Sequence, residues 1–227
     1  MAAAEVAPSS KSILKLAVLG ATGPTGMEAV KKSLELGHHV TAIVRSPDKL
    51  NNIKNENLDV VKANIFEPES LVPHLQGKDA VLSYLGAHGT TVFNPTTLYS
   101  ESMKSIMTAM ERSNVNRIVT LTSWITEYPN NTPIKVKLVR PIMLLGGFMK
   151  DMRRMEKILE ESSFNYTIIR PPGLSNASAK KNYKLVEAAQ FVDGAGMFIP
   201  RADVADASLK VLLTPEWDKK AVAIGCD

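Results

Sequence analysis

The stretch VLGATGPTGMEAV, residues 18–30, decides the fold of this 227-residue chain. It continues a short apolar run and places Gly20, Gly23 and Gly26 at regular spacing, and apolar residues at helical spacing follow directly. A glycine loop between a buried strand and a helix is the turn at which an α/β sheet holds a phosphate group. The stretch therefore predicts a parallel sheet whose first ligand contact lies at this loop.

Each glycine of the loop has its own physical reason. Gly20 lets the chain turn sharply at the strand end, Gly23 lets a pyrophosphate approach the backbone, and Gly26 lets the helix pack closely on the sheet. The helix N-terminus offers unpaired N–H groups to phosphate oxygens. Pro24 lies near the helix start, where the N–H group that proline lacks would have no partner within the helix. The alternative is a glycine-rich turn without a ligand, which the strand before and the helix after disfavour. No Gly-Lys-Ser/Thr follows, so the loop is not a P-loop.

The end of the second expected strand discriminates between the two nicotinamide dinucleotides. An NAD site usually carries an acidic residue there, about 20 residues beyond the glycines, to bind the ribose 2′-hydroxyl. This chain has Arg45 at that position, and Lys49 follows it. A guanidinium can bind a 2′-phosphate through two parallel hydrogen bonds. The sequence therefore predicts NADP(H) as the cofactor, with a solvated surface arginine as the alternative.

Strand and helix patterns alternate along the rest of the chain. Buried-strand patterns cover residues 14–19, 40–44, 58–63, 80–85, 117–122, 166–169 and 221–224, and helical patterns cover 25–36, 68–76, 96–113, 148–162 and 203–213. This alternation is typical of an α/β fold with a Rossmann-type, doubly wound parallel sheet. We expect residues 12–227 to form one such domain, with a small C-terminal elaboration on the substrate side. Residues 1–11 are expected to be a flexible tail.

The composition of the chain limits the kinds of partner that it can bind and the cellular compartment in which we expect it. The chain is 44% hydrophobic and 22% charged, which suits a globular core. Its net charge of +4 comes without a dense basic face interleaved with aromatics, so we expect no nucleic-acid partner. Cys226 is the single cysteine, which excludes an internal disulfide or a cysteine-based zinc site, and no metal is expected. Without a signal peptide or an apolar run of about 18 to 20 residues, we expect a cytoplasmic protein that does not enter a membrane.

The spacing GxxGxxG, with TGxTG inside it, resembles the atypical, NmrA-like branch of the short-chain dehydrogenase/reductase superfamily. In ordinary members a Tyr and a Lys four residues apart on one helix face do the acid–base work. Here Phe148 and Met152 stand at those positions, and neither can transfer a proton. Tyr99 and Lys104 are five residues apart on an earlier helix. Ordinary alcohol–ketone dehydrogenation is therefore not expected.

From Leu16 to about Leu213 the chain is similar, more narrowly, to the NADPH-dependent flavin reductases that also reduce biliverdin-IX-beta. The similarity is carried by GATGPTG, VTAIVRSPDKL, NPTTLYSESMKSIMTAMERSNVNRIVTLTS and RRMEKILEESSFNYTIIRPPGL. It implies a monomer that transfers hydride from NADPH to a flavin, a linear tetrapyrrole or a similar planar acceptor. One alternative is a redox sensor that binds NADP(H) without turnover. A weaker alternative is an isomerase or epimerase with a tightly held cofactor.

The resemblance also implies a set of cofactor contacts at strand ends and on the adjacent loops and helices. They are Gly20, Thr22, Gly23, Pro24 and Thr25 at the pyrophosphate; Arg45, Asp48 and Lys49 at the 2′-phosphate; Asn64 and Ile65 at the adenine; Leu85 and Gly86 at the ribose; Tyr99, Leu121, Thr122 and Met152 elsewhere in the site; and Pro172, Gly173 and Leu174 over the nicotinamide. The family has histidines at the places of Met152 and Gly173, so any assistance from those imidazoles is missing here.

Three residues are candidates for contact with the substrate. Ser123, the catalytic candidate, ends the fifth expected strand, where its hydroxyl can bond a substrate carbonyl or N5 of a flavin, or else satisfy a backbone group. Trp124 can stack on a planar acceptor or belong to the core. His88 can face the pocket as an acid or be solvated. The segment after Ser123 is longer than in the family and is a candidate lid; its cations Lys135, Lys137 and Arg140 can attract an anionic acceptor or be solvated.

Overall fold

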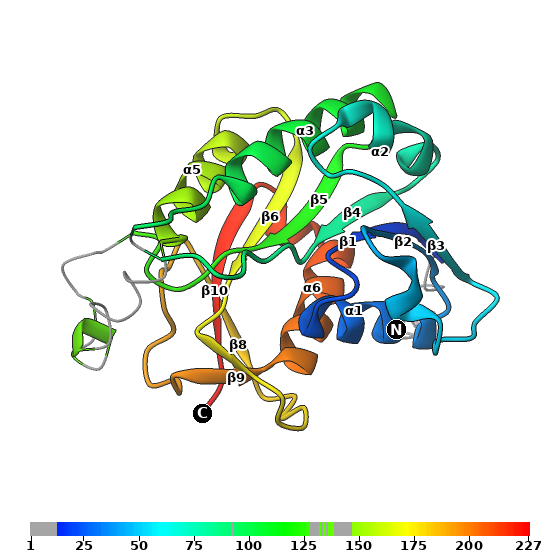
Figure 1. The fold of residues 1–227 in the computed structure, drawn as a ribbon. Helices are drawn as coiled ribbons and strands as arrows, with labels where there is room; N and C mark the ends of the chain where they lie inside the picture. The colour runs from blue at the N-terminus through cyan, green and yellow to red at the C-terminus, as the bar shows by residue number, and fades with distance from the viewer. Residues whose placement is uncertain (1–12, 92, 128–131, 133, 135, 139–146) are drawn as a thin grey trace, which may run out of the picture.

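The computed structural model describes residues 13–91, 93–127, 132, 134, 136–138 and 147–227. Its centre is an eight-stranded sheet in the order β3-β2-β1-β4-β5-β6-β10-β8 (Figure 1). The strands are β1 (Lys15–Leu19), β2 (His39–Val44), β3 (Leu58–Lys62), β4 (Ala80–Ser83), β5 (Arg117–Leu121), β6 (Asn165–Arg170), β8 (Lys184–Glu187) and β10 (Lys220–Gly225). The order 3-2-1-4-5-6 of the first six is that of the Rossmann fold. The expected fold class is therefore confirmed.

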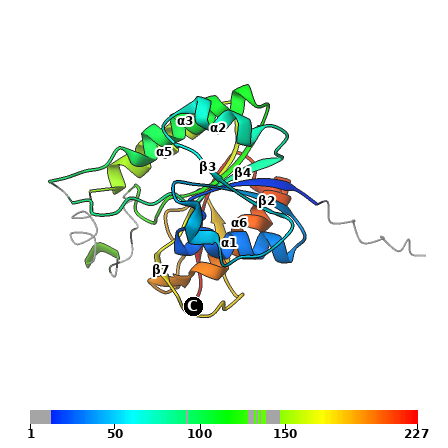
Figure 2. The same cartoon turned by 45° about the vertical axis from the view of Figure 1, so that its right-hand side comes forward.

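Helices cover both faces of this sheet (Figure 2). On one face lie α1 (Pro24–Glu35) and α6 (Arg201–Leu213), and on the other lie α2 (Pro68–Leu75), α3 (Leu98–Arg112) and α5 (Met149–Glu160). Two short 3₁₀ turns, η1 (Pro47–Leu50) and η2 (Pro215–Trp217), join these elements. None of the helices in the described part of the chain is long and apolar enough to cross a membrane.

Strand β1 shows why the sheet is buried on both sides. Leu16 and Val18 belong to the core beneath α1 and α6, whereas Ala17 and Leu19 belong to the core beneath α2, α3 and α5. Successive side chains of a strand point to opposite faces, so a continuous apolar run serves two cores at once. This explains why the expected strands are apolar throughout instead of alternating.

Three short strands were not predicted from the sequence. β7 (Gly173–Ser175) and β9 (Phe198–Pro200) pair in parallel as a separate two-stranded sheet, and β8 pairs antiparallel with β10. The sheet is therefore parallel except at its β8 edge. Strands of three or four residues are too short to display a period, and β8 is mostly exposed, so it lacks the apolar run of a buried strand.

Candidate functional site

The glycine loop connects β1 to α1 at the carboxyl edge of the sheet. Gly20 has φ +73°, in the left-handed region that favours glycine, and a Cβ there would lie 2.5 Å from the carbonyl oxygen of Tyr84. The Gly23 N–H donates to the Gly20 carbonyl at 2.9 Å, which closes the turn. The predicted sharp turn at Gly20 is thus confirmed, and the turn also presses against the end of β4.

The start of α1 is shaped to leave its N–H groups available. Gly23 is the N-cap residue and no side chain caps it, Pro24 follows, and the first turn has no acidic side chain. A Cβ at Gly26 would lie 2.2 Å from the Gly20 carbonyl oxygen, so Gly26 is needed because the helix rests on the loop itself, not on the sheet as expected. Thr25 is buried in this turn, and Thr22 is half-buried. The arrangement fits a phosphate group at the helix N-terminus.

The predicted 2′-phosphate contacts lie on the neighbouring strand. Arg45 follows the last residue of β2, Asp48 and Lys49 lie in η1, and all three side chains are exposed. Because β2 pairs in parallel with β1, the segment that starts at Arg45 leaves the sheet at the same edge as the glycine loop. An exposed guanidinium at this edge can reach a ligand that lies across the strand ends.

The predicted adenine contacts have structural partners of their own. The Asn64 amide nitrogen donates to Glu67 Oε1 at 2.7 Å, and its Oδ1 accepts from the Phe66 N–H at 3.1 Å. Ile65 is buried in the core beneath α2. The Asn64 side chain therefore builds the turn that leads into α2.

The loop after β4 meets α3 at Tyr99. Leu85 is half-buried, Gly86 and His88 are exposed, and the N–H of Ala87 donates to the Tyr99 hydroxyl at 3.1 Å. Burial raises the pKa of Tyr99 above its ordinary value. Lys104 is exposed and pairs with Glu101 at 2.8 Å. Tyr99 and Lys104 therefore do not form an acid–base pair.

Ser123 lies two residues beyond half-buried Leu121, the last residue of β5, and both of its neighbours in the chain are held by hydrogen bonds. The Thr122 hydroxyl donates to Glu156, and the Trp124 N–H donates to the Pro171 carbonyl at 2.8 Å. The Ser123 side chain itself is half-buried. The chain is thus fixed on both sides of this serine, which favours a defined position for its hydroxyl.

Trp124 belongs to the core. Its side chain is 2% exposed, its indole N–H donates to the Ile224 carbonyl at 3.1 Å, and it meets the Phe191 ring edge-on at 6.4 Å between centroids. No face of the indole is left for a stacked acceptor. Of the two interpretations of Trp124, the structure favours the core residue.

A buried ion pair, missed in the sequence, anchors this region. Glu156 on α5 is 0% exposed, and its two oxygens accept from Arg170 Nε and Nη2, each at 2.9 Å, and from the Thr122 hydroxyl at 2.7 Å. Thr126 also donates to both oxygens, and Arg153 donates to one. The sequence did carry a signal, since Glu156 shares a buried helix face with Met152 and Leu159, and a charge there requires partners.

The positions of the absent Tyr and Lys lie at the start of α5. Phe148 is the N-cap residue of α5, and Met152 is 8% exposed in the core that contains Tyr99. Both side chains pack against other apolar residues, so this end of α5 supplies no proton donor from these two positions.

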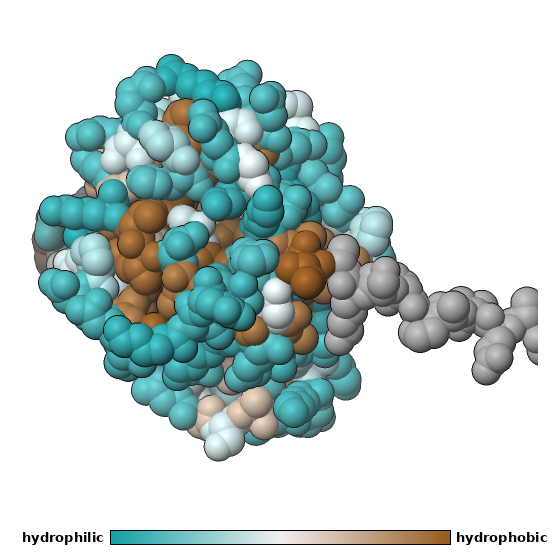
Figure 3. All heavy atoms as spheres, turned by 90° about the vertical axis from the view of Figure 1, so that its right-hand side faces the viewer, coloured by the Kyte–Doolittle hydropathy of each residue, from teal (hydrophilic) through white to brown (hydrophobic). Residues whose placement is uncertain are grey.

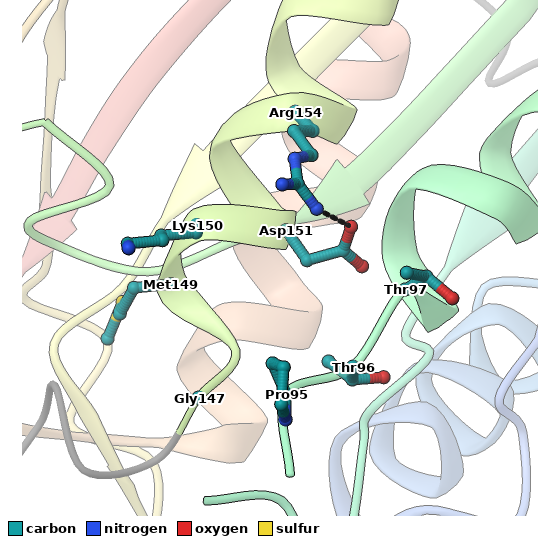
Figure 4. A pocket seen from close by; sticks show the side chains of 8 residues that line it. All are labelled: Pro95, Thr96, Thr97, Gly147, Met149, Lys150, Asp151 and Arg154. Carbon is teal, nitrogen blue, oxygen red and sulfur yellow. Dashed lines mark ion pairs between the residues drawn. The ribbon is translucent and has the colours of Figure 1, made fainter. Parts of the chain in front are cut away.

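Two cavities flank the site. One, of about 430 Å³, lies at the N-termini of α3 and α5 and is lined by Pro95, Thr96, Thr97, Gly147, Met149, Lys150, Asp151 and Arg154 (Figure 4). Buried Asp151 accepts from the Tyr99 N–H at 2.9 Å and from the Ser100 N–H at 3.2 Å, so α5 caps the start of α3. Arg154 pairs with the same carboxylate at 3.9 Å.

The second cavity, of about 410 Å³, places the small β7–β9 sheet beside the glycine loop. It is lined by Pro24, Met27 and Glu28 of α1, by residues 175–179 at and after the end of β7, and by Arg201 and Ala202 after β9. Its lining mixes apolar with polar and charged side chains. Figure 3 shows one face of the molecule, which is mostly hydrophilic and carries groups of apolar residues.

The remaining expected contacts lie on or near β7. Pro172 is buried, Leu174 is half-buried, and the Gly173 N–H donates to the Met197 carbonyl at 2.9 Å. Most of the candidate lid, with Lys135 and Arg140, falls outside the described residues, and Lys137 is exposed. Within the described part of the chain there is no group of three or more His, Cys, Asp or Glu side chains that could hold a metal ion.

Comparison with known proteins identifies relatives of the chain. Residues 20–215 match the family model described as NAD(P)H-binding. A chloroplastic, uncharacterized protein of Arabidopsis thaliana is 28% identical over 219 residues, which cover 92% of this chain and 76% of that protein. A photosystem II assembly factor of Synechocystis is 27% identical over 162 residues, 70% of this chain, and the chain spans only 45% of that factor's length.

Solved structures share the fold at lower identity. A short-chain dehydrogenase/reductase of Veillonella parvula in complex with NADP is 20% identical with a TM-score of 0.77, covering 94% of this chain and 95% of that one. A candidate NADH-flavin reductase of Streptococcus pneumoniae is 22% identical with a TM-score of 0.71, covering 94% and 100%. Together with the match over residues 20–215, this establishes that the chain belongs to the NAD(P)H-binding family of Rossmann-type proteins.

Proposed function

We propose that the protein is an NADPH-dependent reductase that transfers hydride to a planar conjugated acceptor, such as a flavin or a linear tetrapyrrole. The observation that carries the proposal is the replacement of the proton-transferring pair by Phe148 and Met152, both packed against apolar residues. Such an acceptor takes hydride from C4 of NADPH and a proton from solvent, so it needs no side-chain acid. The fold of a candidate NADH-flavin reductase supports this choice.

The chain's own residues would then hold and orient the cofactor and the acceptor, and would exclude water from the site. The loop from Gly20 to Thr25 and the α1 N-terminus would hold the pyrophosphate, and Arg45 the 2′-phosphate. Ser123, fixed between Thr122 and Trp124, would donate a hydrogen bond to the acceptor atom on which negative charge develops. The cofactor, when bound, supplies the hydride. A cytoplasmic location and a monomeric state belong to the same proposal.

The direct test follows the loss of NADPH absorbance with FMN, FAD, biliverdin and dichlorophenolindophenol as acceptors. Turnover with at least one planar acceptor, and no turnover with simple ketones, is the expected result. Tight NADPH binding without turnover of any acceptor would contradict the reductase. That outcome would favour the alternative, a redox sensor that binds NADP(H) without turnover.

Arg45→Ala is expected to weaken NADPH binding about ten- to hundredfold and to leave NADH binding unchanged. The loss corresponds to hydrogen bonds between a guanidinium and a phosphate, which are worth about 1.5–3 kcal/mol. Isothermal titration with both cofactors measures the effect. Arg112→Ala, an exposed arginine at the C-terminal end of α3, is the matched control. Equal losses for NADPH and NADH would contradict the role given to Arg45.

Ser123→Ala is expected to lower kcat for the planar acceptor about tenfold to hundredfold, with the Kd of NADPH unchanged. The reason is the loss of one hydrogen-bond donor that acts on developing charge. Steady-state kinetics with FMN and titration with NADPH measure the two quantities. Exposed Ser163, after α5 and remote from the site, gives the control Ser163→Ala. An unchanged kcat would remove Ser123 from the reaction.

A further inference from the structure

We propose that Phe198, held against Gly173, is a stacking subsite for the planar acceptor; the inference rests on the proposed function and names the residue that would select the acceptor's shape. Gly173 and Phe198 are register partners in the β7–β9 sheet. A Cβ added at Gly173 would lie 2.7 Å from both Cδ1 and Cε1 of the Phe198 ring. The ring therefore fills the space that any side chain at position 173 would need.

This contact explains the glycine. The backbone at Gly173 is not in the left-handed region, so its conformation does not demand glycine. A side chain at position 173 would displace the exposed Phe198 ring, and its Cβ would lie 3.0 Å from the Met197 carbonyl oxygen.

Exposure shows that the ring is open to a ligand. Phe198 is 66% exposed, whereas the next residue of β9, Ile199, is fully buried. A single exposed apolar side chain needs no explanation by itself. Phe198 differs because its ring is held on one side by the Gly173 backbone and is accessible elsewhere, which is the arrangement of a stacking platform.

The small β7–β9 sheet lies near the loop at which we expect the cofactor. The chain after β7 and the chain after β9 both line the cavity of about 410 Å³ that reaches Pro24 and Met27 of α1. The small sheet therefore stands beside the glycine loop, and Gly173 follows directly on buried Pro172. Stacking on an aromatic face accepts any planar conjugated ring, so an isoalloxazine and a tetrapyrrole can use the same subsite.

The test measures equilibrium binding of FMN and biliverdin to the NADP⁺-loaded protein, by flavin fluorescence and tetrapyrrole absorbance. Phe198→Ala is expected to weaken both about tenfold, Phe198→Leu by an intermediate factor, and Phe198→Tyr by less than twofold. The Kd of NADPH should stay within twofold of wild type in all three. Leu213→Ala, an exposed apolar residue at the far end of α6, is the control.

A second variant tests the contact itself. Gly173→Ala should displace the ring and weaken FMN binding in the wild-type background, but should have little effect in the Phe198→Ala background. Such non-additivity is the signature of two groups in direct contact. Equal effects of Gly173→Ala in both backgrounds would overturn the assignment.

The outcomes separate this inference from the proposed function. If wild-type protein binds FMN, the variants weaken binding as expected and NADPH is never oxidised, the subsite is supported and the reductase activity is contradicted. Wild-type protein that reduces FMN while Phe198→Ala leaves its KM and Kd unchanged would remove the subsite alone. A matching loss of NADPH affinity in Phe198→Ala would also overturn the subsite, because the ring would then contact the cofactor. Wild-type protein that neither binds nor reduces a planar acceptor would overturn both.

Discussion

Glu156→Ala should lower the free energy of unfolding by about 3–5 kcal/mol, the cost of removing the main partner of a buried opposite charge. The stranded group would be Arg170, which is 4% exposed and donates two of its hydrogen bonds to Glu156. The Thr122 hydroxyl would lose its acceptor at the same time. Urea unfolding monitored by circular dichroism measures the change.

Two comparisons make this result specific to the buried pair. Glu101→Ala removes an exposed glutamate that pairs with Lys104, and it should cost less than about 1 kcal/mol. Replacing Glu156 and Arg170 together with methionine should cost less than the sum of the single changes, because no unpaired charge remains. A Glu156→Ala loss as small as that of Glu101→Ala would show that water reaches this pair in solution.

The second large effect is expected at Gly26. A methyl group there would lie 2.2 Å from the Gly20 carbonyl oxygen, and backbone atoms on both sides cannot rotate away as a flexible side chain would. Gly26→Ala should lower the free energy of unfolding by about 1–3 kcal/mol. Because the loop must move, NADPH affinity should fall about tenfold to hundredfold in titrations of the folded variant.

The control for Gly26 is another glycine with room for a methyl group. A Cβ at Gly196 would meet its nearest neighbour at 3.4 Å, which is ordinary contact, so Gly196→Ala should leave NADPH binding unchanged. If Gly26→Ala binds NADPH like wild type, the loop tolerates displacement and the proposed pyrophosphate cradle is contradicted.

The fold was predictable because its deciding signals are local. The glycine loop, the continuous apolar strands and the helical spacing place β1 and α1 within one residue of their observed bounds. The β7–β9 pair was not predictable, because it joins three-residue strands about 25 residues apart, and neither strand shows a period. The contact between Gly173 and Phe198 depends wholly on that pairing.

The roles given to the site residues stay predictions, and the packing around them could not be predicted from the sequence. Ser123, expected at the end of the fifth strand, lies two residues beyond the last residue of β5. The sequence could not distinguish a core position from a ligand contact for Trp124. Its indole N–H bonds to the carbonyl of Ile224 in β10, which is 100 residues away along the chain. Glu156 was overlooked for a related reason: its partner Arg170 reads as an ordinary strand-end residue until β6 and α5 are packed together.

The cap that Asp151 places on α3 has a consequence for the order of folding. The amide groups of Tyr99 and Ser100 bond to a carboxylate about 50 residues later in the chain. The first turn of α3 therefore gains its full protection against hydrogen exchange only after α5 has docked, whereas the rest of α3 can form from local contacts. During synthesis, the first turn of α3 leaves the ribosome before the segment that caps it. We therefore expect α3 and α5 to become fully stable together, as one cooperative unit.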